Sequence, residues 1–147
     1  MPLSSDLIGT WELVSREDRT AAGERRVDPG LGADPIGVLT YDSGGRFAAQ
    51  FMKRDRSAPA PEAGPGPAGA NNSRAVGGYD AYFGEYTVDD GKGAVTQKLL
   101  GALSPENVGM TLTRVMSVEA DVLTIELATT TVAGEPVTRT LRWRRIA

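Results

Sequence analysis

Eight short runs of apolar and β-branched residues, separated by turn-forming residues, constrain the fold of this 147-residue chain more than any other feature. Such runs are typical of strands, and connections as short as DSGG and DDGKG leave no room for crossover helices, so neighbouring strands should pair antiparallel. Eight hairpin-linked strands can close into an up-and-down barrel that has no exposed edges. We therefore predict an all-β barrel with one or two short helices. The runs are LIGTWELVSR (7–16), IGVLTYD (36–42), RFAAQFMKRD (46–55), AYFGEYTVD (81–89), AVTQKLLGAL (94–103), MTLTRVMSV (110–118), VLTIELATTT (122–131) and VTRTLRWRRI (137–146).

One long segment, residues 56–78, interrupts this pattern. It holds four of the nine prolines and no apolar side chain larger than valine, so it cannot supply a core strand. Its last part could form a short helix capped by Asn72 or Ser73. Loops of this length are either functional lids or insertions without structure of their own, and both readings stay open.

The amino-acid composition excludes several classes of chemistry. The chain has no His and no Cys, which rules out Ser-His-Asp and Cys-His catalysis, His- or Cys-bound zinc and a His-ligated haem. Neither an EF-hand-type loop nor a phosphate-binding glycine loop is present, so no cofactor and no metal are expected. The net charge of −3 argues against nucleic acid as a partner.

The length suits one domain over residues 1–147, as a monomer or homodimer. No run approaches the ~20 apolar residues of a membrane helix, and the N-terminus does not resemble a signal peptide. A cytoplasmic location without membrane association is therefore the expectation.

Several segments together resemble the lipocalin-like domain family of bacteria and fungi. They are SSDLIGTWELVS, PIGVLTYDSGGRFAAQFMKRDR, YDAYFGEYTVDDGKGAVTQ, LSPENVG, LTR and LRWRR, and their order and spacing cover nearly the whole chain. The resemblance implies a small barrel with an internal pocket, but says little about what enters it. Members of the family often carry histidine where this chain has Gln97, so a role that needs a titrating imidazole is not expected here.

The alternation of side chains along each strand predicts which residues line the pocket. In the third run, one face carries Gln50 and Met52 and the other carries three apolar side chains. We expect the polar or aromatic residues of one face in each strand to point inward: Gln50, Tyr82, Tyr86, Gln97, Arg114 and Trp143. Of these, Tyr82, Gln97 and Arg114 are the candidate catalytic residues. The candidate substrate-binding residues are Gln50, Met52, Tyr86, Met116 and Trp143.

Each candidate also has a purely structural interpretation. Tyrosines in such strands are commonly core residues with a satisfied hydroxyl group. Arg114 lies on an otherwise apolar strand face, so it must pair either with a protein carboxylate, such as Glu85 or Glu126, or with an oxygen of a ligand. Trp11 is expected to close one end of the barrel, so that the other end can stay open.

Two functions fit this sequence. The first is a cofactor-free cyclase or isomerase of natural-product type, whose barrel holds an apolar small molecule in a reactive conformation while polar side chains bind its carbonyl or enolate oxygen. The second is a non-catalytic carrier of an apolar small molecule. A partly buried acid with a perturbed pKa at the cavity would favour the enzyme.

Overall fold

The computed structural model describes residues 2–57 and 75–147. The short helix or lid predicted within 56–78 falls mainly on residues 58–74 and so lies outside the described residues. The strand runs predicted from the sequence are confirmed, and a two-residue strand, β2, is added to them. The elements are α1 (Leu3–Asp6), β1 (Gly9–Arg19), β2 (Arg25–Arg26), β3 (Ile36–Tyr41), β4 (Arg46–Met52), β5 (Tyr79–Asp89), β6 (Ala94–Ala102), the 3-10 turn η1 (Pro105–Asn107), β7 (Thr111–Glu119), β8 (Val122–Thr130) and β9 (Pro136–Arg145).

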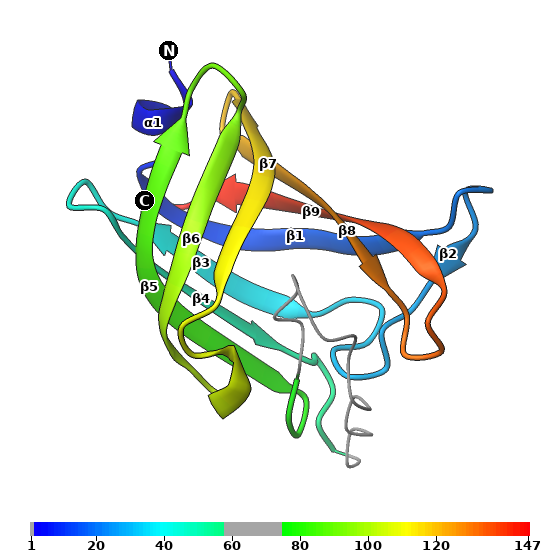
Figure 1. Ribbon diagram of the computed structural model, residues 1–147. Coiled ribbons are helices and arrows are strands. Elements are labelled where there is room, and N and C mark those ends of the chain that lie inside the picture. The colour runs from blue at the N-terminus through cyan, green and yellow to red at the C-terminus, as the bar shows by residue number, and fades with distance from the viewer. Residues whose placement is uncertain (1, 58–74) are drawn as a thin grey trace.

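The strands form a closed antiparallel barrel (Figure 1). From β3 to β9 each strand pairs with the next along the chain, β1 pairs with β3, and β9 returns to pair with β1. The pairing of β1 with β9 runs from Trp11 opposite Arg145 to Arg19 opposite Thr138, so it closes the barrel over almost the full length of both strands. The predicted all-β, eight-stranded barrel is therefore confirmed, with β2 as an extra strand on the far end of β1.

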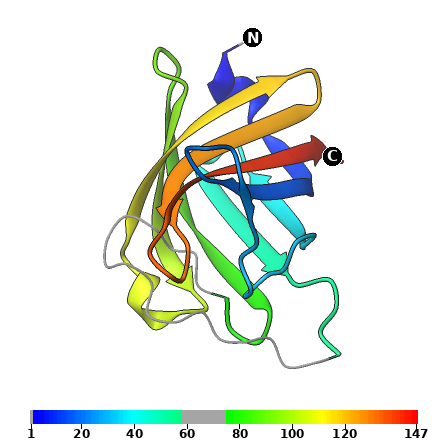
Figure 2. The same ribbon diagram turned by 90° about the vertical axis from the view of Figure 1, so that its right-hand side faces the viewer.

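The two ends of the barrel differ. Tight turns β3–β4, β5–β6 and β7–β8 lie at the end that carries α1, whereas the longer connections and η1 lie at the opposite end (Figures 1 and 2). We call these the helix end and the loop end. No helix within the described residues is long and apolar enough to cross a membrane.

Trp11 and its neighbours fill the helix end. The indole is fully buried, and its Nε1 donates a hydrogen bond to the Leu7 carbonyl oxygen at 3.0 Å. The Arg145 guanidinium lies over the ring at 4.3 Å from its centroid and donates a hydrogen bond to the Ile8 carbonyl. A side chain on Gly9, whose φ is +146°, would collide with that guanidinium, so the Gly-x-Trp sequence lets Arg145 reach the tryptophan.

A β-bulge redirects the second half of β1. The register with β9 shifts between Leu13 and Ser15, so the inward face passes from Trp11 and Leu13 to Arg16 and Asp18. Both charged side chains are buried. The bulge therefore turns two charged side chains into the interior near the loop end.

Candidate functional site

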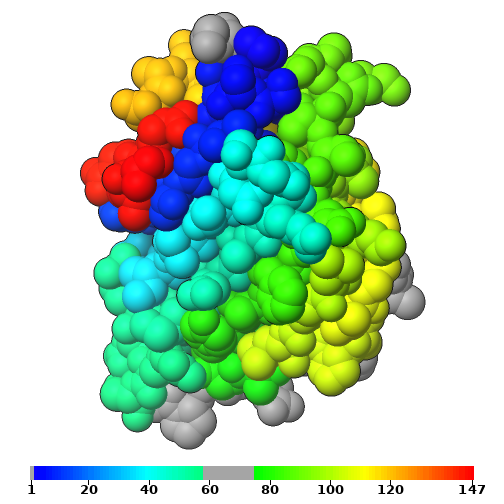
Figure 3. All heavy atoms as spheres, turned by 90° about the vertical axis from the view of Figure 1, so that its left-hand side faces the viewer, coloured from blue at the N-terminus to red at the C-terminus, as the bar shows by residue number. Residues whose placement is uncertain are grey.

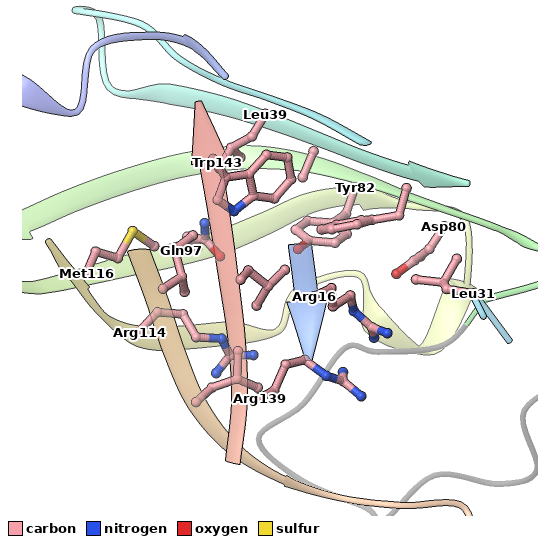
Figure 4. Close-up of a pocket in the computed structure, with 15 residues that line it drawn as sticks. Arg16, Leu31, Leu39, Asp80, Tyr82, Gln97, Arg114, Met116, Arg139 and Trp143 are labelled. Carbon is pink, nitrogen blue, oxygen red and sulfur yellow. The ribbon is translucent and has the colours of Figure 1, made fainter. Parts of the chain in front are cut away.

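A cavity opens inside the barrel between its middle and the loop end (Figure 4). Its volume is about 540 Å³ with the open mouth included, and the room that the centres of water-sized molecules can reach is about 50 Å³. That room holds a few waters, so a larger ligand must extend into the mouth or displace side chains. Its apolar wall consists of Leu31, Leu39, Ala49, Phe51, Met116, Ile125, Leu127, Leu141 and Trp143.

Two ion pairs stand on the polar side of the cavity. The Arg139 guanidinium binds both oxygens of Asp18, at 2.7 and 2.9 Å, and both side chains are buried. Arg16 pairs with Asp28 at 3.2 Å. Burial and the nearby Arg139 charge lower the pKa of Arg16 to about 10, so it stays protonated near neutral pH. Burial opposes ionisation of Asp28, but the Arg16 charge holds the pKa of that carboxyl below its usual value.

Arg114 reaches the same cavity from β7 without a carboxylate partner among the residues that the structure describes. Among the described residues, its one hydrogen bond is a long one, 3.5 Å, from Nη1 to the carbonyl oxygen of the adjacent Thr113. The two carboxylates considered from the sequence do not reach it: Glu85 pairs with Arg46 at 3.6 Å, and Glu126 is exposed on the outward face of β8. Desolvation lowers the pKa of Arg114, and the charge of Arg139 lowers it further.

Asp80 is a buried carboxyl at the cavity. The first inward residue of β5, it is 4% exposed, and its Oδ1 has no hydrogen-bond partner within the described part of the chain. Burial raises the pKa of Asp80 to about 7, and the Ala81 amide and the Arg16 charge oppose this only partly. Both its protonated and its ionised forms are therefore populated near neutral pH.

Two further polar groups face the cavity. Trp143 is 1% exposed, and its Nε1 also lacks a partner among the described residues. Gln97 is buried, and its Nε2 donates to the Tyr41 hydroxyl at 2.6 Å, which in turn contacts the Met116 sulfur at 3.8 Å. Because the Gln97 amide nitrogen is used in this way, the Gln97 amide oxygen is the group that can accept a hydrogen bond from a ligand.

The structure brings together five of the residues selected from the sequence. Figure 4 shows the Trp143 indole and the Tyr82 ring over the apolar part of the cavity, with the Arg114 and Arg139 guanidinium groups across from them. Tyr82, Gln97, Arg114 and Trp143 face the cavity, as predicted, and Met116 also lines it. Their roles toward a ligand stay predictions.

The other three candidates lie elsewhere. The inward orientation predicted for Gln50 is wrong, because β4 buries the bulkier apolar face that carries Phe47, Ala49 and Phe51. Gln50 and Met52 instead line a shallow groove on the outer surface of β3, β4 and the start of β5, which is the cyan to green side seen in Figure 3. Whether they contact a ligand stays a prediction.

Tyr86 lies at the helix end. Its ring packs edge-to-face on Tyr41 at 4.8 Å, and its hydroxyl donates to the Asp42 carbonyl at 2.5 Å. It packs against the core but does not line the cavity.

Sequence reasoning missed Asp80, Arg16 and Arg139. Asp80 precedes the predicted start of its strand, and the period-2 pattern of β1 places Arg16 outward unless the bulge is known. Arg139 shares the alternation of Leu141 and Trp143, so extending that face by one residue would have found it.

Within the described residues, no three or more acidic side chains are grouped so as to hold a metal ion.

Comparison with known proteins agrees with this architecture. A family model described as the lipocalin-like domain matches residues 8–146, which include all nine strands, and no curated protein matches the chain. A barrel of this kind, with an internal cavity, is suited to binding a small molecule. The chain belongs to the lipocalin-like domain family.

Proposed function

We propose that this barrel binds a small, largely apolar molecule in its cavity and catalyses its isomerisation or cyclisation without a cofactor. The observation that carries the proposal is Asp80: a buried carboxyl at the cavity, with one oxygen that has no partner among the described residues and a pKa of about 7. A group that exchanges its proton near neutral pH is poised to act as a general acid and base. A carrier for an apolar ligand has no need of such a group.

The surrounding residues suit proton transfer beside a carbonyl group. The Asp80 carboxylate would take a proton from the carbon next to the carbonyl and return it to another carbon after the double bond has moved, so that no oxidant or reductant is needed. The negative charge that develops on the carbonyl oxygen would be stabilised by the Trp143 N–H, which has no partner among the described residues. For Tyr82 and Gln97, we propose that they orient the substrate from the cavity wall.

Double-bond migration in 3-cyclohexen-1-one tests this proposal with a substrate small enough for the cavity. Loss of a proton from one carbon and its gain by another convert this ketone into the conjugated 2-cyclohexen-1-one, whose ultraviolet absorbance reports the rate. We expect the wild-type protein to accelerate the conversion and Asp80→Asn to reduce the acceleration by about a hundredfold or more. The matched control is Asp34→Asn, because Asp34 is exposed and pairs with Arg54 at the surface.

Equal rates for wild type and Asp80→Asn would contradict the catalytic role. Binding of the ketone without any acceleration would support the alternative, a non-catalytic carrier. Circular dichroism of both variants checks that the barrel remains folded.

A further inference from the structure

Among the described residues, the charges at the cavity do not balance. Three arginines reach it, Arg16, Arg114 and Arg139, and two carboxylates, Asp28 and Asp18, pair with the first and the last of them. One positive charge, on Arg114, is left without a carboxylate in the described part of the chain. Asp80 offsets it only in those molecules whose Asp80 carboxyl is ionised, because its pKa is about 7.

The surroundings of Arg114 destabilise its positive charge. The side chain is half-buried, desolvation disfavours its charged form, and Arg139 repels it. Because a guanidinium in a protein does not become neutral by losing a proton, Arg114 needs a hydrogen-bond acceptor for its N–H groups. Its 3.5 Å contact with the Thr113 carbonyl is too long to satisfy it.

A second unsatisfied donor faces the same space. Trp143 Nε1 is buried and has no described partner, and Figure 4 shows it directed into the cavity on the side of Gln97 and Arg114. An acceptor oxygen in the cavity would satisfy both donors, whereas a purely apolar ligand would leave both unpaired.

We propose that the natural ligand is a monocarboxylate or a comparable organic monoanion, whose negative oxygen binds Arg114 while its apolar part packs against Trp143, Phe51 and Met116. The single excess charge matches a monoanion, and the apolar wall matches a short hydrocarbon group. This inference deepens the proposed function, since it uses the same cavity and gives the substrate class a charge.

Hexanoate and hexanamide provide the test, because they share size and shape and differ in charge. Calorimetric titration of the full chain should show that hexanoate binds more tightly than hexanamide. Arg114→Met should weaken hexanoate binding about ten- to a hundredfold, the loss expected for a charged hydrogen bond, and leave hexanamide binding unchanged. The matched control is Arg142→Met, which removes an exposed arginine from the outer face of β9 and should change neither affinity.

Wild-type protein that binds the two compounds equally, or binds neither, overturns the proposal whatever the variants do. Loss of both affinities together in Arg114→Met also overturns it, because that residue would then only support the fold. If the methionine variant does not fold, Arg114→Lys keeps the charge and should retain a reduced preference for hexanoate; a preference for hexanoate over hexanamide as strong as that of the wild type would count against the site.

The two proposals fail separately. Tight hexanoate binding through Arg114, with no ketone isomerisation, would refute the catalytic role and leave the anion site. Isomerisation that depends on Asp80, with no preference for hexanoate, would refute the anion site and leave the catalytic role.

Discussion

At the scale of single residues, burial decides what each charged pair contributes. Arg139 and Asp18 pair inside the barrel, with side chains 5% and 6% exposed, whereas Arg144 and Glu12 pair on the outside of the same two strands, at 2.6 Å but 60% and 48% exposed. Water solvates the outer pair in the folded and unfolded states alike, so its bond adds little to stability. Removing one inner partner leaves a charge buried without compensation.

Asp18→Asn should therefore lower the free energy of unfolding by about 3–5 kcal/mol. Glu12→Gln, the control on the same strand, should lower it by no more than about 1 kcal/mol. Urea unfolding followed by tryptophan fluorescence measures both. Similar losses for the two variants would mean that the inner pair is not desolvated.

Asp80 predicts a specific dependence of stability on pH. Because its pKa is about 7 in the folded protein and near the ordinary aspartate value in the unfolded chain, the folded state holds a proton that the unfolded state has lost between about pH 4 and pH 7. The contribution of Asp80 to stability is thus most favourable below that window and falls as the pH rises through it.

Asp80→Asn removes this dependence. The free energy of unfolding of the variant minus that of the wild type should therefore increase between about pH 4 and about pH 8. The increase should be up to about 4 kcal/mol, since each unit of pKa shift corresponds to about 1.4 kcal/mol. Denaturant unfolding of both proteins at the two pH values measures the difference. A stability difference that stays constant with pH would show that the Asp80 pKa is not raised.

At the scale of elements, regular alternation was predictable and its interruptions were not. The sequence identified the strands, the antiparallel order and the inward faces of β5, β6, β7 and β9, because these follow from apolar runs, short turns and period-2 patterns. It misoriented β4, where both faces carry apolar residues and only the packing of Phe47 and Phe51 decides between them. It also missed Arg16, because the bulge in β1 has no distinct sequence signal.

A second irregularity, between β5 and β6, depends on Gly84. The register shifts between Phe83 and Gly84, and a Cβ on Gly84 would lie 1.8 Å from the Lys98 carbonyl oxygen, which is backbone and cannot swing away. Gly84→Ala should therefore destabilise the barrel by about 1–3 kcal/mol or more.

The control is Gly91→Ala in the exposed β5–β6 turn, where a Cβ would meet the Asp89 carboxylate at an ordinary 3.5 Å. We expect that variant to unfold within about 0.5 kcal/mol of wild type. Thermal melting compares the two substitutions, and a fully stable Gly84→Ala protein would contradict the close approach of β5 and β6.

At the scale of the whole molecule, the barrel has one end that is filled by side chains and one end that holds a cavity. Trp11, α1 and Arg145 pack the helix end, while the cavity with Trp143, Asp80 and Arg114 opens toward the loop end. The chain has two tryptophans, one in each half, and their indole N–H groups differ: that of Trp11 is bonded to Leu7, and that of Trp143 has no described partner. They provide a reporter and an internal reference for ligand binding.

Proton–nitrogen NMR of the two indole N–H groups, with Trp143→Phe used to assign them, tests most directly whether this cavity is the binding site. On titration with 2-cyclohexen-1-one, the stable product of the proposed isomerisation, we expect the Trp143 signal to move downfield as its N–H gains an acceptor and the Trp11 signal to stay in place. A shift of the Trp11 signal alone, or saturable binding that moves neither signal, would place the ligand outside this cavity and contradict the account.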